Sequence, residues 1–122
     1  MYKLIIKSNF SSAHQLRHYR GKCENLHGHN WNIEVILLSE SLDKTGMAID
    51  FHEAESIISK VISKFDHAYL NDLKEFKKDN PTTEHIARVI HEKLAPLFAE
   101  KKVTVSEVGV WESDKCGAYY KP

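Results

Sequence analysis

The N-terminal residues of this chain alternate in polarity as a half-buried β-strand does, and the alternation ends on a histidine. Residues 2–10 form the strand-like run, and continuing it without a bulge would place on one face Tyr2, Leu4, Ile6, Ser8, Phe10, Ser12 and His14. A second strand-like run covers residues 30–38. Antiparallel pairing of the two segments would bring His14 beside His27 and His29, so the pattern predicts a strand pair with imidazoles gathered at one end.

His27 and His29 flank Gly28, and in an extended strand both imidazoles would project from the same face. Both could then reach one ion, and a catalytic zinc typically takes three protein ligands and leaves a fourth position open for water or substrate. Taken alone, His14 is better interpreted as a surface or capping residue, but beside the His-Gly-His pair it becomes the leading third ligand. We therefore predict a Zn2+ site made of His14, His27 and His29, with the thiol of Cys23 close by.

Two amphipathic helices are predicted in the middle of the chain. Asp50 begins a sequence that resembles a capping box, and helical spacing of apolar residues follows over residues 51–64. Asn80 and Pro81 can act as the N-cap and first residue of a second helix, in which Pro96 predicts a kink or an early end.

The C-terminal part of the chain returns to strand-like patterns. A run of valines changes phase between Val105 and Val108, as a β-bulge would cause, and a short strand follows over residues 118–121. The order ββααββ favours an α+β fold, with an antiparallel four-stranded sheet and both helices on one face. Such a sheet has two edges, and exposed edges invite pairing between chains, so we expect a homo-oligomer that extends the sheet across subunits.

Length and charge exclude several classes of protein. The 122 residues suit one domain spanning residues 1–122. The 17 Lys and Arg balance 17 Asp and Glu, so no net field favours nucleic acid or an anionic membrane as a partner. No apolar run has membrane-spanning length and the N-terminus has no signal-like pattern, so we expect a soluble cytoplasmic protein. Cys23 and Cys116 are expected to be free thiols, and Cys116 to be a small buried hydrophobic residue.

Two further motifs carry titratable groups. Asp66 and His67 are neighbours in the loop between the helices, although adjacent side chains usually diverge and a loop histidine is more often solvated than a general base. Glu112 ends a β-branched run, where a strand terminus could present its carboxylate to a pocket or leave it exposed at an edge. Neither motif identifies a reaction by itself.

Together these motifs closely resemble the 6-pyruvoyltetrahydropterin synthase family, in particular its bacterial queuosine-pathway branch, the 6-carboxy-5,6,7,8-tetrahydropterin synthases. The resemblance covers nearly the whole chain as blocks in register, namely Phe10-Ser11-Ser12-Ala13-His14, Cys23 with His27-Gly28-His29-Asn30-Trp31, Gly46-Met47 with Asp50-Phe51, Asp66-His67 with Tyr69-Leu70-Asn71, Asn80-Pro81-Thr82-Thr83-Glu84, and Trp111-Glu112. Only three residues separate Cys23 from the His-Gly-His pair, and this spacing resembles the bacterial branch and favours a carboxypterin product.

The resemblance implies a tunnelling fold in which the sheets of three subunits join into a barrel and two trimers stack into a hexamer, with active sites between subunits. The site residues that it implies are the zinc ligands His14, His27 and His29, the catalytic thiol of Cys23, the proton relay of His67 with Asp66, the pterin anchor Glu112, and the pocket residues Thr82 and Thr83. The implied reaction converts 7,8-dihydroneopterin triphosphate to 6-carboxy-5,6,7,8-tetrahydropterin, acetaldehyde and triphosphate.

Alternatives to this reading stay open. One is triphosphate elimination that gives 6-pyruvoyltetrahydropterin, or a related cleavage of the pterin side chain. Another is a non-enzymatic scaffold or pterin-binding protein, in which Cys23 closes a structural four-ligand zinc site. The triphosphate has several candidate partners, which are Arg17, His18, Arg20, Lys22 and Lys115. The remaining helical histidines are expected to be structural or surface residues, namely His52, His85 and His91.

Overall fold

A computed structural model describes residues 1–20 and 24–122 of the chain. Within these residues one sheet has the strand order β3-β1-β2-β4-β5. The strands are β1 (Tyr2–His14), β2 (His27–Ser39), β3 (Ala68–Tyr69), β4 (Thr104–Trp111) and β5 (Gly117–Tyr120). The helices are α1 (Phe51–Ile62) and α2 (Thr83–Ala99), and two short 3-10 turns lie between them, η1 (Leu70–Asp72) and η2 (Lys74–Phe76).

The first two strands form a long antiparallel pair that is unbroken from Tyr2 opposite Ser39 to His14 opposite His27. The alternation predicted for residues 2–10 therefore continues to the histidine without a bulge. Both strands are longer than the predicted runs because the polar residues near their ends still pair through the backbone. One face is buried under the helices, with Phe10 and Trp31 stacked at a centroid distance of 6.0 Å.

The predicted antiparallel four-stranded sheet is wrong in one respect: in the described part of the chain the sheet has five strands and is mixed. The additional strand, β3, pairs in parallel with the end of β1, where Ser12 lies opposite Ala68. It is only two residues long, so no hydrophobic alternation could mark it. Its backbone is aligned instead by the preceding residue, since the amide of His67 donates a hydrogen bond to the Ser11 carbonyl over 2.6 Å.

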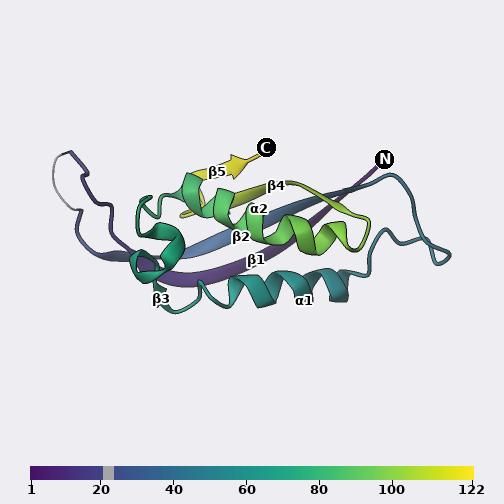
Figure 1. Ribbon diagram of the computed structural model, residues 1–122, viewed down its shortest axis with the longest axis horizontal. Coiled ribbons are helices and arrows are strands. Elements are labelled where there is room, and N and C mark those ends of the chain that lie inside the picture. The colour runs from purple at the N-terminus through teal and green to yellow at the C-terminus, as the bar shows by residue number, and fades with distance from the viewer. Residues whose placement is uncertain (21–23) are drawn as a thin grey trace.

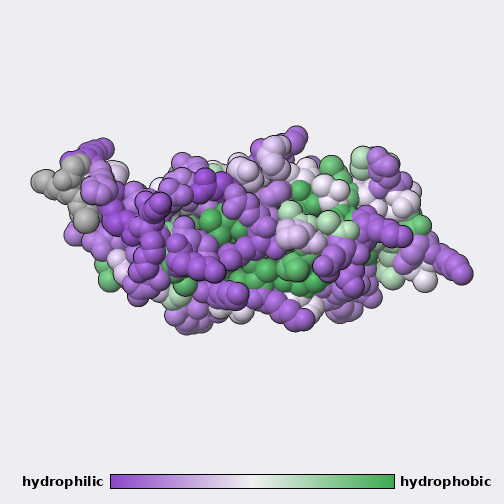
Figure 2. Space-filling model, viewed as in Figure 1, coloured by the Kyte–Doolittle hydropathy of each residue, from purple (hydrophilic) through white to green (hydrophobic). Residues whose placement is uncertain are grey.

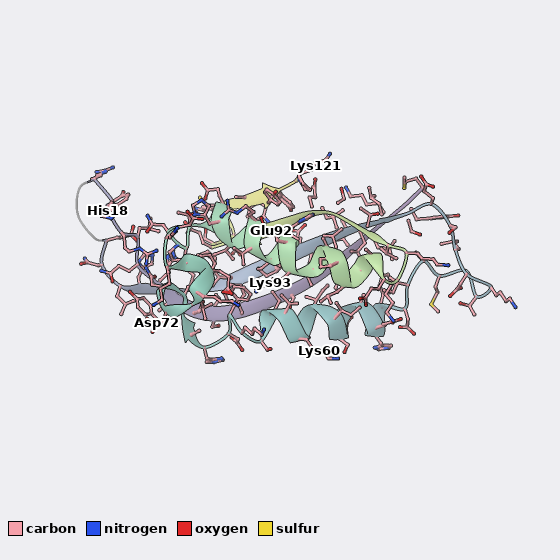
Figure 3. All side chains as sticks on the ribbon, viewed as in Figure 1. His18, Lys60, Asp72, Glu92, Lys93 and Lys121 are labelled. Carbon is pink, nitrogen blue, oxygen red and sulfur yellow. The ribbon has the colours of Figure 1, made fainter. Side chains whose placement is uncertain are left out.

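Both helices lie over the same face of the sheet, α1 along β1 and α2 along β4, as Figure 1 shows. On this side of the molecule hydrophobic residues show as a strip between the two helices, whose outer surfaces are hydrophilic (Figure 2). Lys60 illustrates the outer surface, because it extends from α1 away from the sheet (Figure 3). None of the helices described is both long and apolar enough to cross a bilayer.

The helix starts test the capping predictions. The Asp50 carboxylate accepts a hydrogen bond from the His52 amide over 2.8 Å, which confirms the cap of α1, although this helix ends at Ile62. The second prediction is wrong, because Thr82 caps α2. The Asn80 side chain is engaged elsewhere, since it accepts from the amide and donates to the carbonyl of Arg17, each over 2.8 Å. The helix continues past Pro96 to Ala99 and does not end at the proline.

The predicted β-bulge is present in β4. Its register against β2 shifts so that Glu107 lies opposite Ile36 while Val105 lies opposite Leu37. The extra residue lets the valines on both sides of the shift face the helices, which explains why Val105 and Val108 are both buried. Beyond the bulge, alternation places Glu112 on the helix-covered side, the same side as the three histidines of β1 and β2.

Candidate functional site

Three histidines meet at one end of the β1–β2 pair. His14 lies opposite His27, and His29 lies opposite Ser12, so all three imidazoles project from the helix-covered face. One ligand atom from each lies within 4.8 Å of the others, an arrangement that could hold a metal ion. His14 is buried and the other two are half-buried, so the cluster is closed on the core side and open on the other. The predicted triad is therefore brought together by strand register.

The hydrogen bonds of two of these imidazoles define their tautomers. His14 Nδ1 lies 2.8 Å from the Pro81 carbonyl, and His27 Nδ1 lies 2.8 Å from the Asn25 carbonyl. A carbonyl oxygen can only accept, so in each ring Nδ1 carries the hydrogen and Nε2 of the neutral ring presents a lone pair. The two Nε2 atoms face each other at 2.9 Å. Two lone pairs at this distance repel unless a proton or a metal cation lies between them, and three neutral imidazoles are a donor set that suits zinc.

Burial favours the neutral form of the His14 imidazole. Removal from water lowers the pKa of this imidazole, although its bond to the Pro81 carbonyl works against that shift. A lowered pKa favours the neutral ring at neutral pH. Metal ions bind histidine in this neutral form, so the environment of His14 prepares it as a ligand.

Glu112 lies beside the histidine cluster. Its Oε2 atom is 3.9 Å from His29 Nε2 and accepts a hydrogen bond from Thr83 Oγ1 over 3.3 Å. The Glu112 side chain is 37% exposed, so the carboxylate stays accessible from outside. Thr82, which was predicted with Thr83 to line a pocket, accepts from the His85 amide and caps the helix. The structure therefore joins Thr83, but not the Thr82 hydroxyl, to the carboxylate.

Asp66 and His67 form a pair, although side chains at adjacent positions usually diverge. His67 Nδ1 lies 3.0 Å from Asp66 Oδ2, and the backbone of His67 has a φ of 52°, a left-handed conformation that turns its ring back toward its neighbour. The amide of Ser11 donates to Asp66 Oδ1, and this bond, with a smaller contribution from His67, lowers the pKa of the Asp66 carboxyl.

This pair is separated from the histidine cluster by the sheet. The His67 side chain is 83% exposed and borders a cavity of about 480 Å3. That cavity also includes Ser11, Ala13 and Asn30, whose strand parity places them on the face opposite the three imidazoles, and it extends along the strands to the position of His29. One chain thus brings Glu112 and Thr83 to the metal candidate, but it does not bring His67 there.

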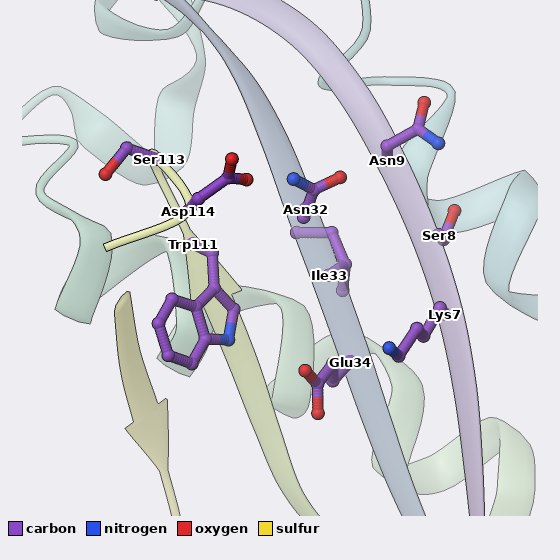
Figure 4. Close-up of a pocket in the computed structure, with 9 residues that line it drawn as sticks. All are labelled: Lys7, Ser8, Asn9, Asn32, Ile33, Glu34, Trp111, Ser113 and Asp114. Carbon is purple, nitrogen blue, oxygen red and sulfur yellow. The ribbon is translucent and has the colours of Figure 1, made fainter. Parts of the chain in front are cut away.

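The face of the sheet that the helices do not cover, called the open face below, carries a second polar cavity of about 450 Å3 farther along the strands. Figure 4 shows its lining residues projecting from β1, β2 and the end of β4, with the Trp111 ring beside Asn32 and Glu34. It includes none of the three clustered histidines.

The other predicted residues have varied environments. Cys23 and Lys22 lie outside the described residues. Arg17 donates to the carbonyls of Phe76 and Asp79, so its guanidinium is occupied in holding a loop, whereas Lys115 is exposed.

The burial of Cys116, His91 and His52 can be compared with the roles predicted for these residues from the sequence. Cys116 is exposed in the turn between β4 and β5, so its prediction as a buried hydrophobic residue is wrong. His91 is buried and bonded to the Val105 carbonyl over 2.9 Å, and His52 is exposed on α1, which confirms structural and surface roles.

Glu24 is a neighbour of the cluster that sequence reasoning missed. Its Oε1 atom lies 3.4 Å from His27 Nδ1. The signal available in the sequence was its position three residues before His27, at the start of the His-Gly-His pair.

Comparison with known proteins places this geometry in a family context. Residues 3–122 match the family model described as 6-pyruvoyl tetrahydropterin synthase. The chain is 30% identical over 129 residues to the 6-carboxy-5,6,7,8-tetrahydropterin synthase of Bacillus subtilis, an alignment that covers 99% of this chain and 86% of that protein. It is also 30% identical over 115 residues to the dihydroneopterin monophosphate aldolase of Pyrococcus furiosus, which covers 94% of this chain and 93% of that protein.

A solved structure confirms the fold class. The 6-pyruvoyl tetrahydropterin synthase of Caenorhabditis elegans matches with a TM-score of 0.86 and 29% identity, over 99% of this chain and 95% of that one. The α+β tunnelling fold with two helices is therefore correct, and the strand count and the mixed sheet are the points corrected above.

Proposed function

This chain belongs to the 6-pyruvoyl tetrahydropterin synthase family, and on that premise we propose that it is a zinc-dependent 6-carboxy-5,6,7,8-tetrahydropterin synthase acting in queuosine biosynthesis. The reaction converts 7,8-dihydroneopterin triphosphate and water to 6-carboxy-5,6,7,8-tetrahydropterin, acetaldehyde and triphosphate. The observation that carries the proposal is the placement of Glu112, held by Thr83, 3.9 Å from one member of a three-histidine cluster. A metal ligand set and an acceptor for a pterin ring thus lie side by side.

Glu112 is the proposed anchor of the substrate. A carboxylate accepts two parallel hydrogen bonds from an amino group and an adjacent ring N–H, which is the donor pattern of the pterin pyrimidine edge. Thr83 occupies one lone pair of Oε2 and so restricts rotation of the carboxylate. Fixing the ring in this way would direct the side chain of the substrate toward the imidazoles.

His14, His27 and His29 would hold the zinc through their free ring nitrogens. When bound, the metal supplies Lewis acidity toward the oxygens of the substrate side chain. The contribution of the chain is to orient the imidazoles, through the backbone carbonyls that accept the Nδ1 hydrogens of His14 and His27.

Cys23 and His67 are the proposed proton-transfer groups. Cys23 would accept a proton as a thiolate, which requires a pKa below the free value of about 8.5. Asp66 accepts the Nδ1 hydrogen of His67, which leaves Nε2 free to exchange a proton with substrate. The relay is thus oriented before substrate arrives.

The site would be completed by a second subunit. In one chain the relay and the imidazoles lie on opposite faces of the sheet, while the edges formed by β5 and by β1 with β3 remain available for pairing. We propose a hexamer built as a dimer of trimers, in which His67 of one subunit serves the metal site of another. Coexpressing His27→Ala and His67→Asn chains tests this arrangement, because mixed oligomers would regain activity that each variant lacks alone. If mixed oligomers are verified but activity does not recover, then His27 and His67 must act within one chain.

Product analysis tests the reaction itself. Zinc-loaded protein is incubated with 7,8-dihydroneopterin triphosphate, and the products are identified by liquid chromatography and mass spectrometry. Formation of 6-carboxytetrahydropterin with acetaldehyde supports the proposal, whereas 6-pyruvoyltetrahydropterin without acetaldehyde supports the pyruvoyl alternative. Zinc binding without turnover of any pterin would favour a structural scaffold with Cys23 as fourth ligand.

An aldolase is the second candidate function. The relative from Pyrococcus furiosus has the same 30% identity as the Bacillus subtilis synthase and covers most of this chain. The two candidates differ in the phosphorylation of the substrate. Parallel assays with dihydroneopterin monophosphate and triphosphate at equal concentrations separate them, because the synthase proposal requires the triphosphate as leaving group.

A further inference from the structure

Two asparagine side chains take the place of a neighbouring strand just beyond the end of β1. Asn71 accepts from the amide of Gln15 over 2.9 Å and donates to its carbonyl over 2.7 Å. Asn80 forms the same pair of bonds with Arg17, each over 2.8 Å. The bonded residues alternate, as they do along the edge of a strand, so the backbone that follows His14 is held at two successive points.

Asn80 is also adjacent to the residue that holds one member of the metal candidate. The carbonyl of Pro81 accepts the Nδ1 hydrogen of His14 over 2.8 Å. Arg17 lies three positions after His14, so the bonds at Asn80 and Pro81 close a short ring with the chain between them. In a ring of this size the position of the Pro81 carbonyl depends directly on the bonds between Asn80 and Arg17. Asn71 has no such connection, because within the described chain no hydrogen bond joins η1 to an imidazole of the cluster.

Side chains fix the path of the segment before α2, because residues 80–82 belong to no helix or strand. The Asn80 carbonyl accepts from the His85 ring over 2.7 Å. The Arg17 guanidinium donates to the Asp79 carbonyl over 3.0 Å. Both bonds act on residues beside Pro81 in the chain, so Asn80 and its contacts determine where the Pro81 carbonyl lies.

We propose that Asn80 is a positioning residue of the metal centre, which holds the Pro81 carbonyl against His14 and thereby keeps the hydrogen of that ring on Nδ1. The proposal rests on the metal site put forward above and adds a residue to it. A neutral histidine can carry its hydrogen on either ring nitrogen, and the nitrogen of His14 that faces the cluster is Nε2, 2.9 Å from His27 Nε2. A ring with its hydrogen on Nε2 has no lone pair for the metal. Asn80 therefore sets the fraction of His14 rings that are ready to bind.

Zinc affinity measured without substrate tests this role. Dissociation constants are determined by competition with a chromogenic chelator for the wild-type protein, Asn80→Ala and the matched control Asn71→Ala, which removes the same two bonds to the backbone at the neighbouring point. Asn80→Ala should bind zinc about 10-fold more weakly, the lower end of the range for losing a partner behind a metal ligand. Asn71→Ala should bind zinc as tightly as the wild type, because the backbone of His14 is held by its pairing with His27.

The tautomer of His14 gives a readout that a general loss of stability would not change. In the metal-free protein, at a pH where the ring is neutral, the 15N chemical shifts of its two nitrogens show which one carries the hydrogen. The wild type and Asn71→Ala should carry it on Nδ1, and Asn80→Ala should show a mixture of the two tautomers. An unchanged Nδ1–H tautomer in Asn80→Ala would refute the proposal even if zinc binding weakens.

Thermal melting of the metal-free variants controls for folding. Each alanine variant loses two hydrogen bonds, and Asn71 is the more buried of the two residues, so Asn71→Ala should lower the melting temperature at least as much as Asn80→Ala does. Asn80→Asp is a second variant of the same size, for use if the alanine variant does not fold. Its carboxylate cannot donate to the Arg17 carbonyl, so it should show the mixed tautomer as well, and a pure Nδ1–H tautomer would contradict the proposal.

The remaining outcomes distinguish this inference from the proposed function. If the wild-type protein binds no zinc, the metal site itself fails. If the wild type binds zinc and Asn80→Ala binds it equally well, the metal site stands and the role of Asn80 is refuted. An equal loss of zinc affinity in both alanine variants would also refute it, because the two asparagines would then act only on the fold at this end of β1.

Discussion

The Nε2 atoms of His14 and His27 face each other at 2.9 Å while the Nδ1 atom of each ring donates to a backbone carbonyl. This relationship decides the chemistry of the pair. Neither ring can turn its hydrogen inward without losing a carbonyl bond, so the two lone pairs stay directed at one point. Such a pair is poised for a cation, and the register of β1 against β2 produces it.

Removing one ligand should abolish metal binding. His27→Ala leaves two imidazoles, which hold zinc poorly, so we expect loss of stoichiometric zinc and of activity. Metal content is measured by mass spectrometry of the dialysed protein. His52→Ala, at an exposed histidine of α1, is the control and should bind as much zinc as the wild type. Full zinc occupancy in His27→Ala would contradict the ligand assignment.

Cys23→Ala distinguishes a catalytic thiol from a fourth ligand. If Cys23 accepts a proton, the variant should keep about one zinc per subunit and its melting temperature while carboxypterin formation falls by orders of magnitude. A closed structural site contributes directly to folding, so loss of a fourth ligand would lower zinc content and melting temperature together. The three quantities are measured on the same preparation, and the second result would exclude the catalytic role.

His67→Asn should reduce turnover roughly 100-fold or more, the scale expected for losing a general acid or base, and leave zinc content unchanged. Asparagine is the suitable replacement because it tolerates the left-handed backbone of this position, where φ is 52°. Lys102→Asn is a matched control at an exposed position with a φ of 61°. Steady-state kinetics compare the two, and equal turnover would make His67 a loop residue only.

Two adjacent threonines should respond differently to the same change. Thr83→Val removes the hydroxyl that holds Glu112, so we expect a higher KM for the pterin substrate with little change in melting temperature. Thr82→Val removes the cap of α2 and should cost about 1 kcal/mol of stability, with a smaller effect on KM. Kinetics and denaturant unfolding are measured on both. If KM rises in Thr82→Val and not in Thr83→Val, the assignment of the contact with Glu112 to Thr83 is contradicted.

Asp66 should contribute a pH dependence to stability in acid. Its pKa is lowered on folding, chiefly by the Ser11 amide, so its contribution is present above the unfolded value of about 3.9 and is lost as pH falls through the folded value. Melting temperatures from pH 5 downward should therefore fall less in Asp66→Asn than in the wild type. Asp72→Asn, at an exposed position, is the control. If melting temperature falls equally with pH in all three proteins, Asp66 does not contribute to the loss of stability in acid.

The sequence by itself determined the parts of this protein that depend on local periodicity. Alternation from Tyr2 to His14 defines a strand whose last side chain must share the buried face, and the spacing of His27 and His29 does the same in the facing strand. The cap at Asp50 and the bulge before Val108 are also local, because a few neighbouring residues specify each of them. Such features follow from backbone geometry, and antiparallel pairing then assembles the histidines.

Only the tertiary structure decided the contacts between distant segments. Asn80 could have capped a helix, but it bonds to Arg17, 63 positions away, and Thr82 caps α2 in its place. The bond between Thr83 and Glu112 depends likewise on where α2 crosses the end of β4.

The same limit applies to the proton relay and to Glu24. His67 is adjacent to Asp66 in sequence, yet its left-handed backbone and its place on the open face come from the pairing of β3 with β1. Glu24 becomes notable only because its covered oxygen lies against His27. A polar side chain can form hydrogen bonds of similar free energy with many different partners. The packing of the whole chain, and not a local sequence pattern, therefore decides which hydrogen bonds form.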